Sequence, residues 1–384
     1  MGLIIRPYED RDRDGFAAVR SVVYRGGEPI APDEPMLRDD GHGSVAEVDG
    51  NIAGVAVGLD MRVTRGPKAE LRCAGVASVG VSPEYRTAGV GAALMRGVLP
   101  QYRELGFQVA ALYPFRDSYY RNFGYEVGGT RYRISCSPSC FPRIQAPLAN
   151  RMLPARDHDA VRGCYESFAR RYSGANLRGE TMWWRQLGGD TPFTLYTAGD
   201  PIQAYVAVRL VEGFWEEQEI REVVWITEEG YLSALALVGS LGVNQDRLSW
   251  HEPGDSPFIS RFWDHGVEAK IDRQIMWRAL DVPNCLRALS PEGDGEASLE
   301  VDDQELPENR GPWRVRWKEG CVEVENSPSA GLAMDVRTFS QALIGEPSFD
   351  TLLRDSRVRT TDEQSAKSFA RLLTPIRAYC LDFF

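Results

Sequence analysis

Hydrophobic and polar residues alternate and then recur at helical spacing along the first third of the chain. Short alternating or wholly apolar stretches predict strands at residues 3–6, 43–48, 52–59, 71–81 and 109–113. Asp49-Gly50-Asn51, between the second and third of these strands, is a hairpin signal. Helical spacing appears at residues 14–24, 88–105 and 117–122. The pattern predicts a mixed α/β fold built on a mostly antiparallel sheet.

The same order of elements recurs in the middle of the chain, before the pattern changes again. The repeat comprises a helix at 157–172, a hairpin at 193–210, a strand at 220–226, a helix at 231–241 and a strand at 247–250. Further on, a sheet is predicted by alternation at 297–301, 313–317 and 321–324, followed by helices at 336–344 and 365–373. Because 384 residues are many for a single core, we expect three domains, at 1–145, 146–282 and 283–384.

The corner between the strand 71–81 and the next helix is rich in glycine. It reads Val79-Gly80-Val81-Ser82-Pro83-Glu84-Tyr85-Arg86-Thr87-Ala88-Gly89-Val90-Gly91. A helix begins with unpaired N–H groups and a positive dipole end, so Gly89 and Gly91 would let the backbone approach an anion, and Arg86 adds a positive charge. The corner lacks the third glycine of the dinucleotide fingerprint, and the chain has no Gly-Lys-Ser/Thr motif. The glycines either bind phosphate or simply start a tightly packed helix.

Composition and charge narrow the classes of function. A net charge of -11 argues against nucleic acid as a partner and is compatible with cationic ligands, although acidity often only serves solubility. No apolar run approaches the roughly 20 residues that span a bilayer, and the first residues lack the apolar segment of a signal peptide. We therefore expect a soluble, cytoplasmic protein. Seven cysteines without a C-x-x-C pair, the nearest approach being Cys136-x-x-x-Cys140, predict free buried thiols and no metal site.

The strand, turn and helix around Gly89 resemble the GNAT acetyltransferase superfamily, whose R-x-x-G-x-G/A turn holds the pyrophosphate of acetyl-CoA. The resemblance implies that acetyl-CoA is the co-substrate. The backbone of Val79, Gly80 and Val81 would pair with its pantetheine arm and acetyl carbonyl. The turn that would hold the pyrophosphate consists of Arg86, Thr87, Ala88, Gly89, Val90 and Gly91.

A second motif follows downstream, at Tyr119-Tyr120-Arg121-Asn122-Phe123-Gly124-Tyr125. It resembles the superfamily element Y-x-x-F-G-Y/F, in which the first tyrosine often donates a proton, and the register assigns that position to Tyr120 and not to Tyr119. With an ordinary pKa of about 10, a tyrosine is protonated at neutral pH and suits protonation of the departing CoA thiolate. Without the motif, both tyrosines would be better explained as packing aromatics at a helix end.

The rest of the chain narrows the resemblance to one arrangement of domains. At the corresponding corner of the middle domain the chain reads Thr227-Glu228-Glu229-Gly230-Tyr231, where two carboxylates would repel a pyrophosphate, so this domain resembles a degenerate GNAT copy. The last domain, with the stretch MDVRTFSQALIGEPSFDTLL, resembles a sterol-carrier-like domain. This order resembles the Eis (enhanced intracellular survival) acetyltransferases over essentially the whole chain. The chain departs from that family at Thr87 and Ala88, where Eis proteins often carry further arginines.

The Eis resemblance implies an activity and a mechanism. The chain would be an N-acetyltransferase that moves the acetyl group directly from acetyl-CoA to a primary amine in a ternary complex. The α-carboxylate of Phe384 would reach the first domain and accept a proton from the amine, while Tyr120 protonates the thiolate. Aminoglycosides, polyamines and lysine or peptide amines are all compatible acceptors. The family also implies a homo-oligomer, with a hexamer as one such assembly.

Two further features admit more than one interpretation. The segment 24–40 could attract a cationic acceptor or form a solvated acidic loop, through Glu28, Asp33, Glu34, Asp39 and Asp40. The sterol-carrier-like domain could make the protein a carrier of an apolar ligand with little or no acetyl transfer. Its aromatic residues Trp313, Trp317 and Phe339 would line a cavity in that case, and would pack as core otherwise.

Overall fold

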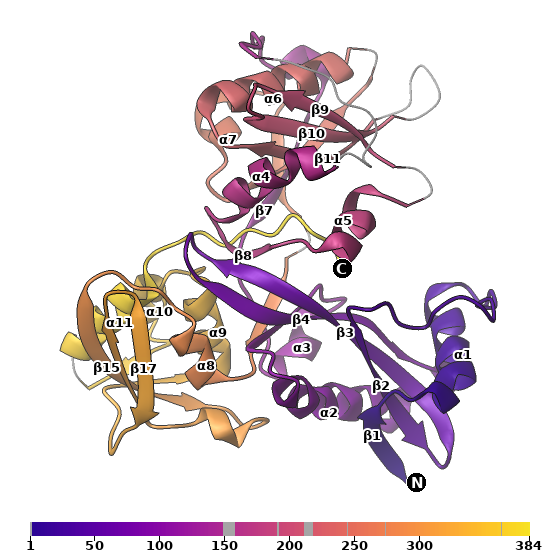
Figure 1. Ribbon diagram of the computed structural model, residues 1–384, viewed down its shortest axis with the longest axis vertical. Helices are drawn as coiled ribbons and strands as arrows, with labels where there is room; N and C mark the ends of the chain where they lie inside the picture. The colour runs from indigo at the N-terminus through magenta and orange to yellow at the C-terminus, as the bar shows by residue number, and fades with distance from the viewer. Residues whose placement is uncertain are drawn as a thin grey trace.

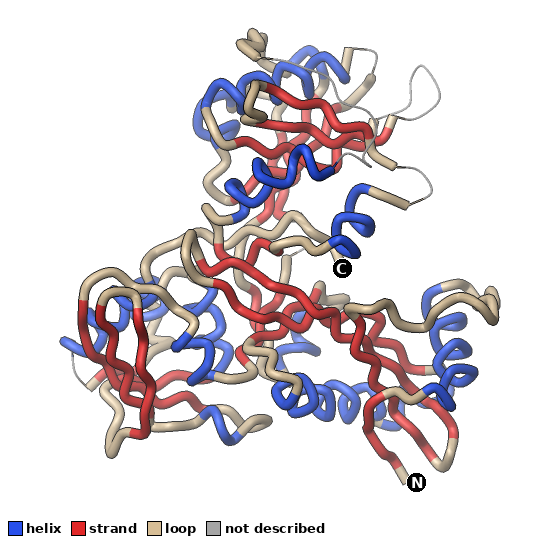
Figure 2. The backbone as a smooth tube through the Cα atoms, in the orientation of Figure 1, coloured by secondary structure: helices blue, strands red, loops and turns tan. Residues whose placement is uncertain are grey.

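The computed structural model describes residues 2–148, 158–189, 192–210, 218–243, 245–272, 274–361 and 363–384. Three units meet near its middle: an N-terminal unit in indigo and violet, a middle unit in magenta and salmon, and a C-terminal unit in orange and yellow (Figure 1). Each unit combines helices with strands, drawn in blue and red in Figure 2.

The N-terminal unit contains an eight-stranded sheet in the order β1-β2-β3-β4-β5-β14-β6, with β8 paired beside β3. The parallel pair is β4 with β5, and the other neighbours run antiparallel, as the sequence predicts. The strands are β1 (Leu3–Pro7), β2 (Gly41–Val48), β3 (Asn51–Arg65), β4 (Glu70–Val81), β5 (Val109–Leu112), β6 (Glu126–Val127), β8 (Ser173–Asn176) and β14 (Met276–Ala279).

Two helices cover opposite faces of this sheet, and a short third, α3 (Asp117–Arg121), follows β5. On one face, α2 (Val90–Glu104) buries Leu94 and Tyr102. On the other face, α1 (Arg13–Tyr24) buries Phe16. Helical spacing of apolar residues is what turns one side of each helix toward the sheet.

The middle unit has two three-stranded sheets, ordered β11-β10-β9 and β12-β7-β13. Its elements are β7 (Arg131–Cys136), α4 (His158–Ala169), α5 (Glu180–Leu187), β9 (Thr194–Ala198), β10 (Ala204–Arg209), β11 (Glu219–Trp225), α6 (Glu228–Leu241), β12 (Leu248–Pro253), α7 (Pro257–Phe262) and β13 (Glu268–Ile271). Strand exchange joins it to the N-terminal unit, because β7 pairs with β12 and β13 while β14 inserts between β5 and β6. The domain boundaries expected from the sequence stay a prediction, and the sheets cross the first of them.

The C-terminal unit has a five-stranded sheet in the order β17-β16-β15-β18-β19 with helices packed on it. Its elements are α8 (Val282–Arg287), β15 (Asp294–Asp302), β16 (Trp313–Lys318), β17 (Cys321–Asn326), β18 (Leu332–Asp335), α9 (Val336–Ile344), α10 (Phe349–Arg354), β19 (Arg359–Thr360) and α11 (Glu363–Leu373). Phe339 and Trp317 are buried in its core, and a Cβ atom on Gly295 would lie 2.3 Å from the Trp317 ring. These two aromatic side chains therefore act as packing residues.

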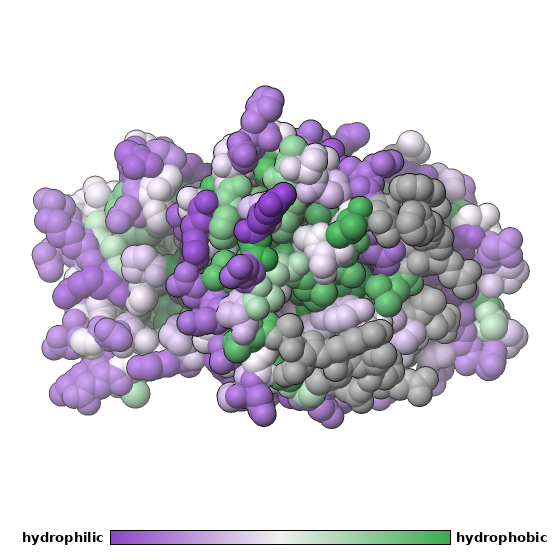
Figure 3. All heavy atoms as spheres, turned by 90° about the horizontal axis from the view of Figure 1, so that it is seen from above, coloured by the Kyte–Doolittle hydropathy of each residue, from purple (hydrophilic) through white to green (hydrophobic). Residues whose placement is uncertain are grey.

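After α11 the chain leaves the C-terminal unit and passes between the other two, so that the C-terminus lies near α5 and β8 (Figure 1). Within the described ranges, no helix is long and apolar enough to cross a membrane. The face seen in Figure 3 has hydrophobic residues between more hydrophilic regions. All seven cysteines are free thiols, but the expectation that they are buried is wrong for Cys321, which is exposed on β17, and for Cys140, which is half-buried.

Candidate active site

Strand β4 carries a bulge close to the glycine turn. Its register against β3 shifts between Val55 and Val57, and Ser78 has a φ of 51°, in the left-handed region. A bulge adds one residue to a strand and redirects the backbone groups beside it. Here the carbonyl of Val79 accepts a hydrogen bond from the Tyr24 hydroxyl at 2.6 Å. The bulge therefore offers Val79 to a partner outside the sheet ladder.

Strands β4 and β5 separate just before this bulge. The parallel pairing joins Cys73–Gly75 to Val109–Ala111, and the described ladder between the two strands ends there. Gly80 and Val81 pair with β3 on one side. On their other side, β5 no longer pairs with β4. An extended ligand arm could pair with this edge in place of a strand.

The chain then turns into α2 through a 3₁₀ turn at Pro83–Ala88. Gly89 is the N-cap of α2 with a φ of 78°, a conformation that suits glycine. Because Gly89 has no side chain to cap the first turn, the N–H groups there stay available to an anion. Residues 86–89 are exposed, and Arg86 Nε donates to the Val81 carbonyl at 3.1 Å, which holds the guanidinium beside the turn.

Tyr119 and Tyr120 on α3 have different surroundings. The hydroxyl of Tyr119 lies at the turn, where a Cβ atom on Gly91 would be 3.0 Å from it. Tyr120 is only 4% exposed, and its ring packs edge-on against Phe115 and Tyr119. Burial raises the pKa of Tyr120, with smaller contributions from Tyr119 and Tyr24, so its hydroxyl is protonated at neutral pH. A phenol in this state can act as a proton donor.

The last residues of the chain lie against the middle unit. Ser173 and Ala378 form a parallel β-bridge, and the Tyr379 N–H donates to the Ser173 carbonyl at 3.0 Å. Gln186 on α5 makes two bonds with the backbone of Phe383, from Nε2 to the carbonyl at 2.8 Å and from the N–H to Oε1 at 3.3 Å. Backbone bonds of this kind fix the path of the tail rather than leave it to fray.

Asp382 anchors this tail in the interior. Its buried carboxylate accepts hydrogen bonds from Arg178 and, at 3.0 Å, from Asn176. Arg178 also pairs with Glu222 on β11 and stacks 4.0 Å from the centroid of the Tyr165 ring. Burial opposes the charge of Arg178, but the two carboxylates outweigh it and raise the pKa of the guanidinium well above its ordinary value. The ion pairs therefore persist at neutral pH.

Phe384 reaches the place where β4 and β5 separate. A Cβ atom on Gly75 would lie 3.0 Å from the Phe384 ring, so this side chain covers the last β4 residue paired with β5. The Tyr113 ring lies 5.4 Å from that of Phe384, and its hydroxyl donates to the Asp382 carbonyl. The tail, the bulge and the glycine turn therefore belong to one region of the N-terminal unit.

Comparison with known proteins identifies the units that build this region. A GNAT acetyltransferase domain model matches residues 4–128, and a sterol carrier protein domain model matches residues 282–381. An uncharacterized N-acetyltransferase of Streptomyces coelicolor is 26% identical over 366 residues, covering 87% of this chain and 88% of that protein. The N-acetyltransferase Eis of Mycobacterium tuberculosis is 23% identical over 358 residues, covering 87% and 85%. The crystal structure of Eis1 from Mycobacterium abscessus has the same fold, with a TM-score of 0.78 at 20% identity and full coverage of both chains.

The chain carries a GNAT acetyltransferase domain and a sterol carrier protein domain, and it is similar to Eis N-acetyltransferases over most of its length. The predicted mixed α/β fold, with a GNAT domain at 4–128 and a sterol-carrier-like domain at 282–381, is confirmed, while the identity of the middle unit as a degenerate GNAT copy stays a prediction. The GNAT match ends directly after β6 (Glu126–Val127), and β7, which follows, lies in a sheet of the middle unit.

In this Eis-like enzyme, the corner of the middle unit that corresponds to the glycine turn is closed. Thr227 is the N-cap of α6, and its Oγ1 accepts a bond from the Gly230 N–H at 3.1 Å. Glu228 pairs with Arg261 at 3.0 Å. A side chain thus occupies an N–H group that a phosphate would need, and a carboxylate stands beside it. Gly89, by contrast, leaves the first turn of α2 open.

The structure brings the predicted site residues of the Eis-like enzyme into the same region, although their roles stay predictions. Val79–Gly91 form one continuous segment of bulge, turn and helix start. Sequence reasoning did not find five residues that contact this segment or the tail: Tyr24, Ser78, Tyr113, Arg178 and Gln186. Arg178 and Asp382 are 204 positions apart, so local pattern carries no sign of their pairing. The aromatic end of the tail was the one signal that it would be held in a core.

One group of possible metal ligands occurs in the part of the enzyme that the structure describes. Ligand atoms of His158, Asp159 and Glu180 lie within 4.8 Å of one another. Arg162 donates to both carboxylates, at 2.8 Å to Asp159 and 2.5 Å to Glu180. A guanidinium therefore already balances these charges, and the group is an ion-pair cluster on the surface of α4 and α5.

Proposed function

We propose that the enzyme transfers the acetyl group of acetyl-CoA to a primary amine by direct attack in a ternary complex. The observation that carries the proposal is the bulged strand β4, which separates from β5 and leads into the uncapped N-terminus of α2. Such a segment suits a ligand with an extended arm and a pyrophosphate at its end. Acetyl-CoA is a co-substrate of this kind.

Binding of acetyl-CoA would use two parts of the segment. The pantetheine arm would lie along Val79, Gly80 and Val81 and replace the hydroxyl of Tyr24 at the Val79 carbonyl. The pyrophosphate would take N–H groups of the turn and the first turn of α2, from Thr87 to Gly91, with Arg86 as the adjacent cation. This assignment needs no metal ion to bind the phosphates.

Proton transfer would involve Tyr120 and Phe384. The ammonium of the acceptor loses a proton to the α-carboxylate of Phe384, directly or through a water molecule, and the free amine attacks the acetyl carbon. The carbon–sulfur bond then breaks, and Tyr120 protonates the thiolate. Support comes from the buried, protonated hydroxyl of Tyr120 and from the Phe384 ring over Gly75.

We propose that the acceptor enters through a cavity of about 600 Å³ between β3, β4 and α5. Its wall includes Met61, whose sulfur borders Gly75 beneath Phe384, and Asn176, which holds Asp382. Of the acidic residues expected to attract a cation, Asp40 lines this cavity, but it pairs with Arg185 at 2.7 Å. Asp40 alone therefore does not select among aminoglycosides, polyamines and lysine or peptide amines. We expect the shape and the lining of the whole cavity to decide which amine binds.

The experiment is an amine panel with detection of released CoA thiol. The enzyme with acetyl-CoA and an aminoglycoside, a polyamine or a lysine peptide should release thiol in proportion to acetylated product. Release equal to that without amine for every acceptor would refute the transfer and favour a ligand carrier. Trp317 and Phe339 are buried in the core of the C-terminal unit, so they do not support a ligand carrier whose cavity they would line. Native mass spectrometry of the same preparation tests the proposed homo-oligomer, including a hexamer.

A further inference from the structure

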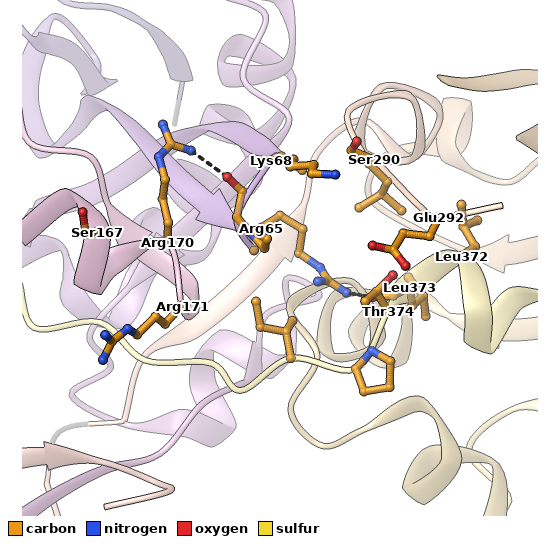
Figure 4. A pocket seen from close by; sticks show the side chains of 16 residues that line it. Arg65, Lys68, Ser167, Arg170, Arg171, Ser290, Glu292, Leu372, Leu373 and Thr374 are labelled. Atoms are coloured by element: carbon orange, nitrogen blue, oxygen red, sulfur yellow. Dashed lines mark hydrogen bonds between the residues drawn. The ribbon is translucent and has the colours of Figure 1, made fainter. Parts of the chain in front are cut away.

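A second large cavity lies where the three units meet, apart from the β4 bulge. It measures about 570 Å³, within the range of small-molecule sites. Its walls are the β3–β4 hairpin (65–69), the end of α4, the segment after α8 and the chain after α11 (Figure 4). Most of the lining is apolar, with contributions from Pro67, Ala69, Leu289, Leu372, Leu373, Pro375 and Ile376.

A buried arginine points into this region from the end of β3. Arg65 is only 6% exposed, and its guanidinium bonds to two carbonyls of the C-terminal unit. Nε donates to Leu343, and Nη2 donates to Leu373, a bond that Figure 4 shows. Among the residues that the structure describes, neither a partner for its Nη1 group nor a carboxylate within ion-pair distance occurs. One end of the guanidinium is thus free to bind a ligand in the cavity.

The surroundings compensate the charge of Arg65 only in part. Leu343 and Leu373 lie in the last turns of α9 and α11, so the guanidinium meets the negative ends of two helix dipoles. Helix ends carry partial charges, whereas a buried cation normally needs a full counterion. Burial lowers the pKa of Arg65 to about 10, so it remains protonated at neutral pH. A ligand anion would supply the missing counterion.

The other charged residues of the cavity leave its net charge positive. Arg170 is paired with Glu70 at 2.6 Å, and Arg171 donates to the backbone carbonyl of Trp225 at 3.1 Å. Lys68, at the rim, has no ion-pair partner in the described parts of the chain. Glu292 lines the cavity on the side of the C-terminal unit. Arg171 keeps its charge, because a backbone carbonyl is not a counterion, so Arg65, Lys68 and Arg171 outnumber the carboxylate of Glu292 and favour an anionic ligand. The free Nη1 group of the buried Arg65 matches one carboxylate oxygen.

We propose that this cavity binds an amphipathic monocarboxylate, of the size of a medium-chain fatty acid. Its carboxylate accepts a hydrogen bond from Nη1 of Arg65, with Lys68 nearby at the rim. Its hydrocarbon chain lies against Leu289, Leu373 and Ile376. This site is independent of the proposed acetyl transfer, since it uses neither the β4 bulge nor the glycine turn. It borders the core in which Trp317 and Phe339 pack, but neither of these two residues lines it.

The test is calorimetric titration of the full chain with decanoate, in the absence of acetyl-CoA and amine. We expect one site per chain with a Kd below about 1 mM, weaker binding of decanol, and no binding of decyltrimethylammonium. Equal affinity for decanoate and decanol would overturn the role of the carboxylate. Tighter binding of decyl phosphate than of decanoate would overturn the monoanionic head group. Because no acetyl transfer is measured, a failure here is distinct from a failure of the proposed function.

Variants locate the site. Arg65→Gln should weaken decanoate binding about tenfold or more, since it removes the charge and keeps donor groups. Because Arg65 also caps two helices, this variant is first checked by its melting temperature. Ser167→Trp, at the exposed edge of α4, should block the cavity and abolish binding without touching those caps. Lys68→Gln should weaken decanoate binding, because it removes the cation at the rim. Its matched control is Lys318→Gln, at an exposed position of β16, which should bind decanoate normally. Normal decanoate binding by folded Ser167→Trp would refute the assignment.

Discussion

At the scale of single residues, two adjacent tyrosines on α3 illustrate how one position along a helix changes chemistry. Tyr120 points into the interior, where burial raises its pKa. Tyr119 turns its hydroxyl toward the glycine turn, near Gly91. A difference of about 100° around a helix separates a candidate proton donor from a residue that borders the proposed phosphate site.

Exchanging each tyrosine for phenylalanine should separate these roles. Tyr120→Phe is expected to lower kcat by about 10²–10⁴-fold with little change in the KM for acetyl-CoA, because a proton donor acts on the leaving thiolate. Tyr119→Phe should leave kcat near normal and act mainly on acetyl-CoA affinity. Steady-state kinetics of both variants measure this. The opposite pattern would transfer the acid role to Tyr119.

The open first turn of α2 gives a second prediction at the residue scale. In Gly91→Asp, a carboxylate replaces hydrogen beside the proposed pyrophosphate and crowds the Tyr119 hydroxyl, so acetyl-CoA affinity should fall at least about tenfold. Isothermal titration with acetyl-CoA measures the change. Gly163→Asp, at an exposed glycine of α4 with open space around it, is the control and should bind normally. Equal affinities would remove Gly91 from the site.

At the scale of elements, the tail depends on a glycine in β4. A Cβ atom on Gly75 would meet the Met61 sulfur at 2.3 Å and the Phe384 ring at 3.0 Å. In Gly75→Ala the ring should shift, and because a displacement of about 1 Å in a catalytic group can cost 10²-fold, kcat should fall by about that factor. Enzyme kinetics and thermal unfolding together measure the effect.

A neighbouring glycine serves as control for the loss of stability. On β3, a Cβ atom on Gly58 would lie 2.6 Å from Tyr102 on the α2 face of the sheet, whereas the Met61 and Phe384 contacts of Gly75 lie on the other face. Both alanine variants should lose about 1–3 kcal/mol of stability through overpacking. Turnover per folded molecule should fall only for Gly75→Ala. A similar loss in both variants would indicate a general effect of distorting the sheet.

Two arginines of the middle unit are each bound to two carboxylates, but we expect their replacement to lower the free energy of unfolding by different amounts. Arg178 is fully buried between Asp382 and Glu222, so Arg178→Leu should lower the free energy of unfolding by about 3–5 kcal/mol, because it leaves buried carboxylates unpaired. Arg162 is 29% exposed, and Arg162→Leu should cost about 1 kcal/mol or less. Urea denaturation compares the two. Equal costs would mean that the buried pairs do not anchor the tail.

At the scale of the whole molecule, all three units contribute to the proposed active site. The C-terminal unit delivers the tail, the middle unit holds Asp382 and Phe383, and the N-terminal unit carries the bulge and the turn. A single GNAT domain would have the turn but not this source of a carboxylate. The proposed base, the α-carboxylate of Phe384, can therefore reach the site only when the three units are packed together.

An extension of a few residues after Phe384 tests this arrangement. It replaces the terminal carboxylate by a peptide group and should lower kcat strongly, while acetyl-CoA affinity and the melting temperature stay near those of the unmodified enzyme. The same residues added before Met1 form the control. If the C-terminally extended enzyme has an unchanged kcat/KM with several amines, another group must accept the proton.

The sequence by itself determined the elements whose signal is local. Hydrophobic periodicity located β4 and α2, glycine at positions 89 and 91 marked the turn between them, and the Tyr-x-x-Phe-Gly-Tyr motif selected Tyr120. Such signals suffice because periodicity and backbone freedom act over a few residues. The same local information indicated that the corner at Thr227 would not bind phosphate.

Only the tertiary structure decided which distant parts meet. Alternation does not specify that β14 joins the first sheet or that β7 joins the second, because pairing partners depend on the packing of the whole chain. The positive φ of Ser78 follows from the register with β3, and serine gives no sign of it. The bonds from Arg178 to Asp382 and from Arg65 to two helix ends likewise arise from burial, which brings together groups that are far apart in sequence.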